Sequence, residues 1–501
     1  MKEHIKRLER SHEFWTVIGL GVVFFLLRLP SLFEPYWYGD EGIYQTLGLA
    51  ITKGRILYTG IWDNKPPLLY YTYALVHSSQ FAIRSLSLLV GLGAIALLFL
   101  LAKKLFNDRK SALIATGVFV LSFGLPTFEG NIANAENFML LPIIAAGYVI
   151  YSLVTKNRDF TSTTSLKLVS VAGLLLGFAF LYKIVAIFDF AAFFVFLIIS
   201  TYRERFTREQ IFSYLNNVWK LFGVFIVGFI FPFFLTILYF ALNHALGEYI
   251  RATFLSTVGY VGYKNAFIIP QGLLISKVII LAIFCLILFI KRQKTSSTTL
   301  FISLWVAFSL FNSFFSQRPY THYVLVLVPA FSLLVGKTFL ERKSQLVKYA
   351  VITLIVGYLG IHYFDHWNIS KTIHYYTNFT SFTSGNKSVN AYDTFFDRRT
   401  IRDYEIISYL NQHKQKDSTL YVWGNDAQIY PLTGTIPPGR FTVAYHVAGN
   451  HKYEKEIGDI LKNNPPHFLV IMRDVPVYPF PMYNYRQVLS VQNADIYERN
   501  N

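Results

Sequence analysis

The sequence predicts a polytopic α-helical membrane protein of about eleven transmembrane helices, followed by an extracytoplasmic α/β domain at the C-terminus. Three observations predict this class. Hydrophobic residues make up 53% of the 501 residues and charged residues only 15%, whereas soluble domains carry about 25% charged residues. Apolar runs long enough to cross a bilayer recur along the first 366 residues. Beyond them, short apolar strands alternate with amphipathic segments.

Mostly apolar runs of about 17–25 residues, bounded by charges, are candidate membrane helices. The first run is interrupted by Arg28 and Pro30, and a cleavable signal peptide is the competing interpretation. We predict a retained helix, because no small-residue cleavage site follows Leu27. The predicted spans are 15–33, 81–102, 113–127, 137–155, 168–181, 185–201, 221–242, 271–290, 297–313, 324–336 and 349–366.

Lys and Arg in the segments between spans predict the orientation, because these residues are enriched on the cytoplasmic side. With the N-terminus inside, the inner segments hold 22 Lys and Arg residues and the outer segments between spans hold 7. The sequence therefore predicts a multi-pass protein of the cytoplasmic membrane, with its N-terminus in the cytoplasm and its C-terminal domain outside.

Two domains are expected, a transmembrane domain over 1–366 and an extracytoplasmic α/β domain over 367–501. The second is predicted from the alternation of strand-like and helix-like segments. Its predicted elements are strands over 418–423 and 467–472 and helices over 401–412 and 451–463.

Charge and cysteine content exclude several kinds of partner and site. The formal net charge of +17 would favour a nucleic-acid partner in a soluble protein, but here the basic residues are explained by the inner segments. No nucleic-acid partner is expected. The one cysteine, Cys285, lies in an apolar run, which excludes a disulfide framework and a cysteine-based metal site.

The longest outer segment between spans, residues 34–80, is rich in aromatic residues and contains several acids and a lysine. We call it the first outer loop. Asp40 and Glu41 lie between two glycines, and a carboxylate partly desolvated near the membrane surface is a better proton acceptor. Lys65 precedes Pro66 and Pro67, which restrict its backbone. Asp63 either pairs with Lys65 or contributes a second carboxylate. An ammonium held in this way suits a lipid phosphate. The competing interpretation is a belt of interfacial aromatics with solvated charges.

Further ionisable residues are predicted on the same outer side. Arg318 and His322 precede the tenth span, Lys183 lies in the turn after the fifth, and Glu136 opens the fourth. Arg offers a bidentate fork to phosphate, and His adds a hydrogen bond. Asp189 lies inside the sixth span, where an ionisable residue is a functional candidate, or it pairs with Lys183. Taken singly, each of these residues is better explained by helix capping or by snorkelling at the interface. Together, acids and bases gathered on one face favour a lipid-phosphate site.

At these residues the chain resembles the GT-C glycosyltransferases, in the branch of the protein O-mannosyltransferases and lipid A aminoarabinose transferases. The resemblance rests on five short motifs in order, of which Lys65-Pro66-Pro67 is the most specific. These are Gly39-Asp40-Glu41-Gly42-Ile43-Tyr44, Trp62-Asp63-Asn64-Lys65-Pro66-Pro67, Asn134-Ala135-Glu136, Gly177-Phe178-Ala179-Phe180-Leu181-Tyr182-Lys183, and Arg318-Pro319-Tyr320-Thr321-His322-Tyr323 with Pro329.

The resemblance implies a polyprenyl-phosphate sugar as donor, a hydroxyl-bearing acceptor (protein, lipid or glycan) and an inverting displacement at the anomeric carbon. It implies that Asp40 is the catalytic base, with Glu41 beside it in the catalytic centre. It assigns the donor phosphate to four residues and the orientation of acceptor or sugar to three. These are Lys65, Arg318, Lys183 and His322 for the phosphate, and Asp63, Glu136 and Tyr44 for orientation.

No cofactor is expected beyond the lipid-linked co-substrate, because cationic side chains can neutralise the leaving phosphate, and a divalent metal stays open. The expected partners are the lipid-linked donor, the acceptor and membrane lipids. A secondary transporter or flippase of a lipid-linked or amphipathic substrate is the alternative. Transporters place polar sites near the bilayer midplane, whereas here only Asp189 is predicted that deep. A membrane anchor that merely presents residues 367–501 would need one helix, not eleven.

Overall fold

The computed structural model describes residues 12–500 except 157–158, 161, 203–207, 262–264, 319, 341–342 and 364–368. It divides into two compact units, each built from separate stretches of the chain. The last boundary between the units, at 372/373, lies near the predicted domain division at 366/367. The first outer loop, however, belongs to unit 2 together with the C-terminal residues. Unit 1 comprises Met1–Leu29, Leu86–Leu238 and Thr257–Thr372, and unit 2 comprises Pro30–Ser85, Tyr239–Ser256 and Ile373–Asn501.

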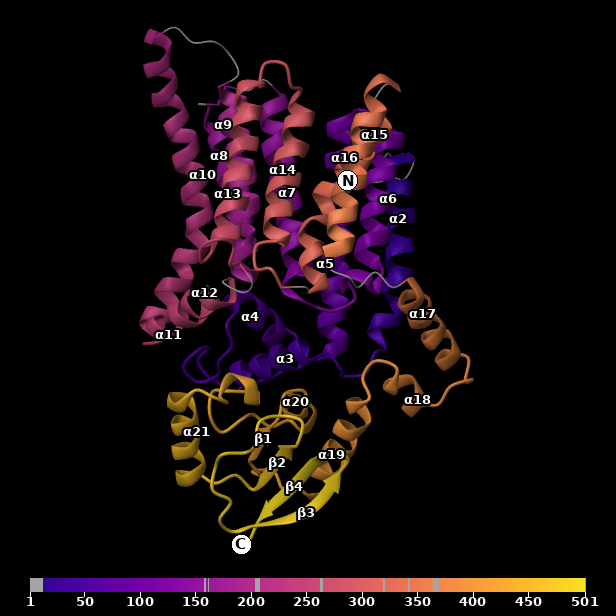
Figure 1. Ribbon diagram of the computed structural model, residues 1–501, viewed down its shortest axis with the longest axis vertical. Coiled ribbons are helices and arrows are strands. Elements are labelled where there is room, and N and C mark those ends of the chain that lie inside the picture. Colours follow the sequence, from indigo (N-terminus) through magenta and orange to yellow (C-terminus); the bar gives the residue numbers. More distant parts are fainter. Residues whose placement is uncertain are drawn as a thin grey trace, which may run out of the picture. The chain divides into compact units, whose positions relative to one another are not determined.

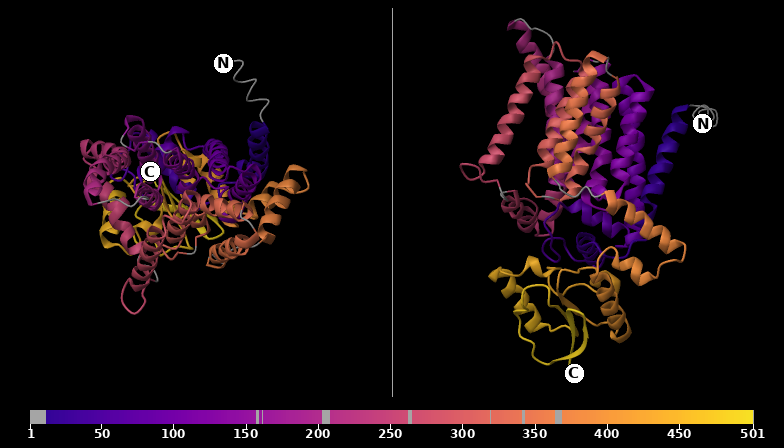
Figure 2. Two further views of the ribbon diagram at one scale, coloured as in Figure 1. Left: turned by 90° about the horizontal axis from the view of Figure 1, so that it is seen from above. Right: turned by 45° about the vertical axis from the view of Figure 1, so that its right-hand side comes forward.

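Unit 1 is a bundle of long helices that run side by side (Figures 1 and 2). Neighbouring helices pack in pairs, notably α7 with α8, α6 with α15 and α9 with α14, around a continuous apolar core. The long helices are α2 (His12–Arg28), α5 (Gln80–Phe106), which begins in unit 2, α6 (Arg109–Gly124), α7 (Ala135–Thr155), α8 (Thr163–Tyr182), α9 (Ile187–Thr201), α10 (Arg208–Leu242), α13 (Gly272–Ile290), α14 (Ser297–Ser313), α15 (Val328–Leu340) and α16 (Lys343–Tyr363).

The predicted class, a polytopic helical membrane protein, is confirmed. Each predicted apolar run coincides with an α-helix over most of its length, although residues 364–366 of the last run lie outside the described part of the chain. Within the described residues, seven helical segments are long and apolar enough to cross a membrane. Three shorter apolar helices are Ser297–Ser313, Val328–Leu340 and Val347–Tyr358, so the count of eleven stays a prediction.

Local sequence explains where several helices start. Asp108 caps α6 by accepting a hydrogen bond from the backbone N–H of Ser111 at 2.7 Å, and Ser162 caps α8 through the N–H of Ser165 at 3.2 Å. These caps satisfy backbone donors that have no partner inside the helix. At the opposite end of α5, Lys103 and Lys104 lie in the last turn, where positive charge is favourable.

Small residues allow α8 and α10 to approach until their backbones meet. A Cβ atom added to Gly173 would lie 2.4 Å from the carbonyl oxygen of Phe225, and one added to Gly177 would lie 2.4 Å from that of Phe229. The two glycines are four residues apart and so share one face of α8. Since the last residue of α8 precedes Lys183, this tight contact fixes the helix that ends at a predicted site residue.

Unit 2 contains the first outer loop and an α/β domain. The first outer loop is not irregular: it folds into two short helices, α3 (Gly39–Thr52) and α4 (Pro67–Leu75). The other helices that belong wholly or partly to this unit are α11 (Leu246–Ile250), followed by a π-helical turn (Arg251–Leu255), α12 (Ser256–Val261), α17 (Ile369–Thr383), α18 (Val389–Thr394), α19 (Arg399–His413), α20 (Ile429–Thr433) and α21 (His451–Asn463).

The sheet of unit 2 has four strands in the order β1-β2-β4-β3 (Figure 1). Strands β1 (Leu420–Trp423) and β2 (Phe468–Met472) are parallel and lie within the two predicted strand segments. The two predicted helices correspond to α19 and α21. Strands β3 (Tyr485–Val491) and β4 (Ala494–Arg499) form an antiparallel hairpin on the β2 side, which the sequence analysis did not predict.

Candidate functional site

Asp40 and Lys65 meet in unit 2, because α3 and α4 fold the first outer loop back on itself. Asp40 lies in the first turn of α3 and accepts hydrogen bonds from the Tyr44 hydroxyl at 2.9 Å and the Lys65 ammonium at 3.4 Å. The Lys65 ammonium also lies 4.8 Å from the centre of the Tyr44 ring. The Asp40 side chain remains 38% exposed, so a ligand can reach its carboxylate.

Asp63 joins the same group from a buried position. Its side chain is 4% exposed, accepts a hydrogen bond from the Tyr70 hydroxyl at 2.7 Å and lies 3.9 Å from the Lys65 ammonium. Lys65 therefore lies near two carboxylates, one exposed and one buried. These residues (Asp40, Tyr44, Asp63, Lys65 and Tyr70) are called the Asp40 cluster.

The backbone of Lys65 is fixed, as the two following prolines predict. Pro67 is the first residue of α4, a position that needs no backbone donor. The Lys65 N–H donates to the Tyr70 hydroxyl at 3.1 Å, and its carbonyl accepts from the Tyr58 hydroxyl at 2.9 Å. Burial raises the pKa of Tyr44 and that of Tyr70, so both phenols stay protonated and donate to the carboxylates.

Glu41 points away from this cluster into a buried ion-pair network. Arg84 holds both of its carboxylate oxygens, one of them through Nε at 3.1 Å, and also contacts Glu34 at 3.0 Å. Arg84 is fully buried, and the Tyr375 hydroxyl donates to Glu34 at 2.6 Å. A carboxylate engaged on both oxygens has little room for an acceptor proton. The geometry favours a positioning role for Glu41 rather than a catalytic one.

The C-terminal part of unit 2 packs directly on α3. A Cβ atom at Gly42 would lie 2.8 Å from the backbone nitrogen of Gln428, so a larger residue does not fit there without movement. The Thr46 hydroxyl contacts the carbonyl of Ala427 at 2.9 Å. Gln428 is held in turn by a hydrogen bond to Asp403 at 2.7 Å. The helix that carries Asp40 is therefore set by residues almost 400 positions later.

One residue of the C-terminal part lies beside the Asp40 cluster and was missed from the sequence. His446 Nε2 lies 3.7 Å from Asp63 Oδ1, and its ring packs edge-on against Trp62 with 4.9 Å between centres. Burial lowers the pKa of His446 to about 4, and Lys65 acts in the same direction. The imidazole is therefore neutral near pH 7. No motif surrounds it, so no signal in a single sequence marks it.

The other predicted residues gather in unit 1. Lys183 forms an ion pair with Glu136, and its ammonium lies 4.2 Å from the centre of the Tyr323 ring. His322 lies between two acids, with Nδ1 3.0 Å from Glu129 and Nε2 3.9 Å from Glu136. We call this the Glu136 cluster. The structure thus brings Lys183, His322 and Glu136 together.

Two further predicted residues are also in unit 1. Arg318 is partly buried, and its backbone N–H donates to the Ser316 hydroxyl at 3.4 Å. Asp189 accepts a hydrogen bond from the indole N–H of Trp305 at 2.8 Å. The predicted alternative for Asp189, a pair with Lys183, is not what the structure shows, because Lys183 pairs with Glu136.

Residues 64–231 match a family model described as dolichyl-phosphate-mannose-protein mannosyltransferase. The fold is similar to that of ArnT from Cupriavidus metallidurans bound to undecaprenyl phosphate, with a TM-score of 0.54 and 13% identity over 97% of this chain and 98% of that one. The GT-C resemblance is confirmed. The match includes Lys65, Glu136 and Lys183, whereas Asp40 and the C-terminal part lie outside it.

A second GT-C structure is similar at a lower score. The archaeal oligosaccharyltransferase AglB from Archaeoglobus fulgidus, in complex with an inhibitory peptide and a dolichol-phosphate, gives a TM-score of 0.48 and 11% identity over 93% of this chain and 70% of that one. No curated protein sequence matches the chain.

Proposed function

We propose that the chain is a GT-C glycosyltransferase that moves a sugar from a polyprenyl-phosphate donor to a hydroxyl acceptor on the outer face of the membrane. The observation that carries this proposal is the exposed Asp40 carboxylate, held between the Tyr44 hydroxyl and the Lys65 ammonium. The fold shared with ArnT, a protein solved with undecaprenyl phosphate, and the match of residues 64–231 support a lipid-phosphate sugar as donor.

In the proposed reaction Asp40 takes the proton from the acceptor hydroxyl, and the acceptor oxygen attacks the anomeric carbon of the sugar. The bond from that carbon to the phosphate oxygen breaks, and the lipid phosphate leaves with the electron pair. One displacement inverts the configuration. Positioned proton transfer of this kind contributes about 100- to 10,000-fold to a rate.

Cationic side chains would hold the phosphate as its negative charge grows. We assign this role to Lys65 and Arg318, and with them to Lys183 and His322, which also contact Glu136. An ammonium has three N–H groups, so Lys183 can keep Glu136 and still donate to a phosphate. We assign Asp63, Glu136 and Tyr44 to orientation of acceptor or sugar, and Glu41 to the position of α3. The transfer we propose uses no bound cofactor.

The proposal is tested with purified protein in lipid, a panel of radiolabelled polyprenyl-phosphate sugars and a membrane extract as the source of acceptor. Consumption of one donor, with label appearing in a second molecule, is the expected result and identifies the sugar. Tight binding of a donor that is then recovered unchanged on the other side of sealed vesicles would instead establish a flippase.

Replacement of Lys65 or Arg318 by Ala is expected to weaken donor binding by roughly ten- to a hundredfold, since a hydrogen bond to a charged group contributes about 1.5–3 kcal/mol. Binding of radiolabelled undecaprenyl phosphate to each purified variant measures this. Lys462→Ala, at an exposed position of α21, is the matched control and should bind as the wild type does. Unchanged affinity in both site variants would reassign these residues to structure.

The proposed orientation places the first outer loop outside the cell. Thr59 is an exposed residue of this loop, and Thr59→Cys in a Cys285→Ser background carries one thiol. We expect an impermeant maleimide to label this variant on intact cells. Labelling that appears only after lysis would reverse the topology and move the reaction to the cytoplasmic face.

A further inference from the structure

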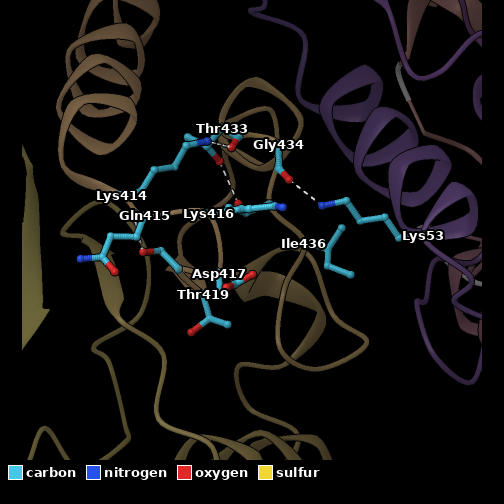
Figure 3. Close-up of a pocket in the computed structure, with 11 residues that line it drawn as sticks. Lys53, Lys414, Gln415, Lys416, Asp417, Thr419, Thr433, Gly434 and Ile436 are labelled. Atoms are coloured by element: carbon cyan, nitrogen blue, oxygen red, sulfur yellow. Dashed lines mark hydrogen bonds between the residues drawn. The ribbon is translucent and has the colours of Figure 1, made fainter.

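A hollow of about 600 Å³ lies in unit 2, away from the Asp40 cluster, and none of the predicted site residues lines it. It forms where the C-terminal end of α3 meets the segments 414–419 and 433–436 (Figure 3). Three lysines, Lys53, Lys414 and Lys416, line it with one carboxylate, that of Asp417. We call it the basic pocket.

Two of the ammonium groups are held in place at the end of α20. Lys53 donates to the carbonyl of Gly434 at 2.6 Å, and Lys414 donates to the preceding carbonyl, that of Thr433. These carbonyls close a helix of only five residues, and capping them is a sufficient structural role for one lysine. Capping of these carbonyls does not account for three lysines around one pocket. Each ammonium has three N–H groups, and each carbonyl engages only one of them.

The positive charges are near enough to oppose each other. Burial lowers the pKa of Lys414, and the charge of Lys53 lowers it further. A lining of three positive charges and one negative charge favours an anion, which would offset this repulsion. Because the hollow measures about 600 Å³ and most of its lining residues have polar side chains, it suits a large hydrated ligand with several charges rather than one small ion.

Helix α3 connects this pocket to the candidate base. Asp40 is in its first turn, and Lys53 is the residue that ends it. At 1.5 Å per residue, the 13 steps between them correspond to about 20 Å along a rigid helix. A ligand anchored by charge at Lys53 would have to be extended to place a hydroxyl at Asp40.

We propose that the basic pocket binds a ligand with two or more phosphate or carboxylate charges, and that this ligand is the acidic part of an elongated acceptor. The second half of the proposal rests on the proposed glycosyltransferase function. An acidic glycan carries such charges, and anionic lipid headgroups share the same chemistry, so the test distinguishes the two sources.

The first experiment is titration calorimetry on the full chain in phosphatidylcholine nanodiscs, with trigalacturonate, a soluble oligosaccharide with three carboxylates, as the probe. We expect saturable binding that weakens about tenfold or more in Lys53→Gln/Lys414→Gln/Lys416→Gln and weakens as salt is raised. Lys452→Gln, an exposed lysine on α21, is the matched control and should bind as the wild type does. No binding, or equal binding by the triple variant, would overturn the proposal.

A second arm distinguishes the two sources of charge. If phosphatidylglycerol in the nanodiscs abolishes trigalacturonate binding to the wild type, the pocket takes lipid headgroups, and the acceptor role is overturned. If binding persists, a glycan is supported. Calorimetry needs no turnover, so failure here with donor consumption intact removes only the pocket. Binding without consumption of any donor removes the proposed function and keeps the anion site.

Discussion

Replacement of Asp40 by Asn is expected to abolish sugar transfer and to leave donor binding largely intact. Asn has nearly the same shape and still accepts a hydrogen bond from Tyr44, so the local fold of α3 is preserved. It cannot take a proton from the acceptor, and loss of a positioned base costs about 100- to 10,000-fold in rate. Release of label from the radiolabelled donor, followed over time, measures the loss.

The matched control is Glu405→Gln, which removes a carboxylate at an exposed position of α19 in the same unit. Its turnover should equal that of the wild type. Donor binding by Asp40→Asn must be measured in parallel, because only a variant that binds donor without turning it over isolates the chemical step. Normal turnover by Asp40→Asn would exclude Asp40 as the base.

The largest effect on stability is expected at Arg84. Its guanidinium is fully buried and pairs with Glu34 and Glu41, whose side chains are also buried. Arg84→Leu leaves two carboxylates without their cation, and breaking a buried pair in this way costs about 3–5 kcal/mol. We expect a lower midpoint of thermal unfolding in detergent and a low yield of folded protein.

Two comparisons show whether the effect comes from the buried charges. Arg473→Leu removes a half-exposed arginine near Asp495 and should cost less than about 1 kcal/mol. Neutralising the whole network with Arg84→Met, Glu34→Gln and Glu41→Gln should recover part of the stability, because no uncompensated charge remains. A triple variant less stable than Arg84→Leu would contradict this explanation.

Much of the fold was predictable because a membrane imposes a strong pattern. Long apolar runs locate the helices of unit 1, and the alternation after residue 367 locates β1 and β2. The hairpin of β3 and β4 was missed because it carries charged residues such as Arg486 and Glu498, which pair across the strands at 2.9 Å on an exposed face. Such a strand lacks the apolar run by which β2 is recognised.

The candidate site was predictable only where its residues are close in sequence. Asp63, Lys65 and the two prolines form one short motif, and the structure places Asp40 beside them. Arg84 carried a signal that was passed over, since an arginine inside a predicted apolar span needs a buried partner. His446 carried none, because its place beside Asp63 depends on tertiary contacts between distant parts of the chain.

The packing of Gln428 against Gly42 has a consequence for biosynthesis. A chain is made from its N-terminus, so α3 is complete long before the residues that cover it have left the ribosome. Until then Gly42 and Thr46 lack their contacts with Gln428 and Ala427, and α3 is without this part of its support. We expect α3, and with it Asp40, to take its final position only when the last quarter of the protein has been translated and folded. Folding of the proposed site would then end with the C-terminal domain, and prematurely terminated chains would lack a correctly placed Asp40.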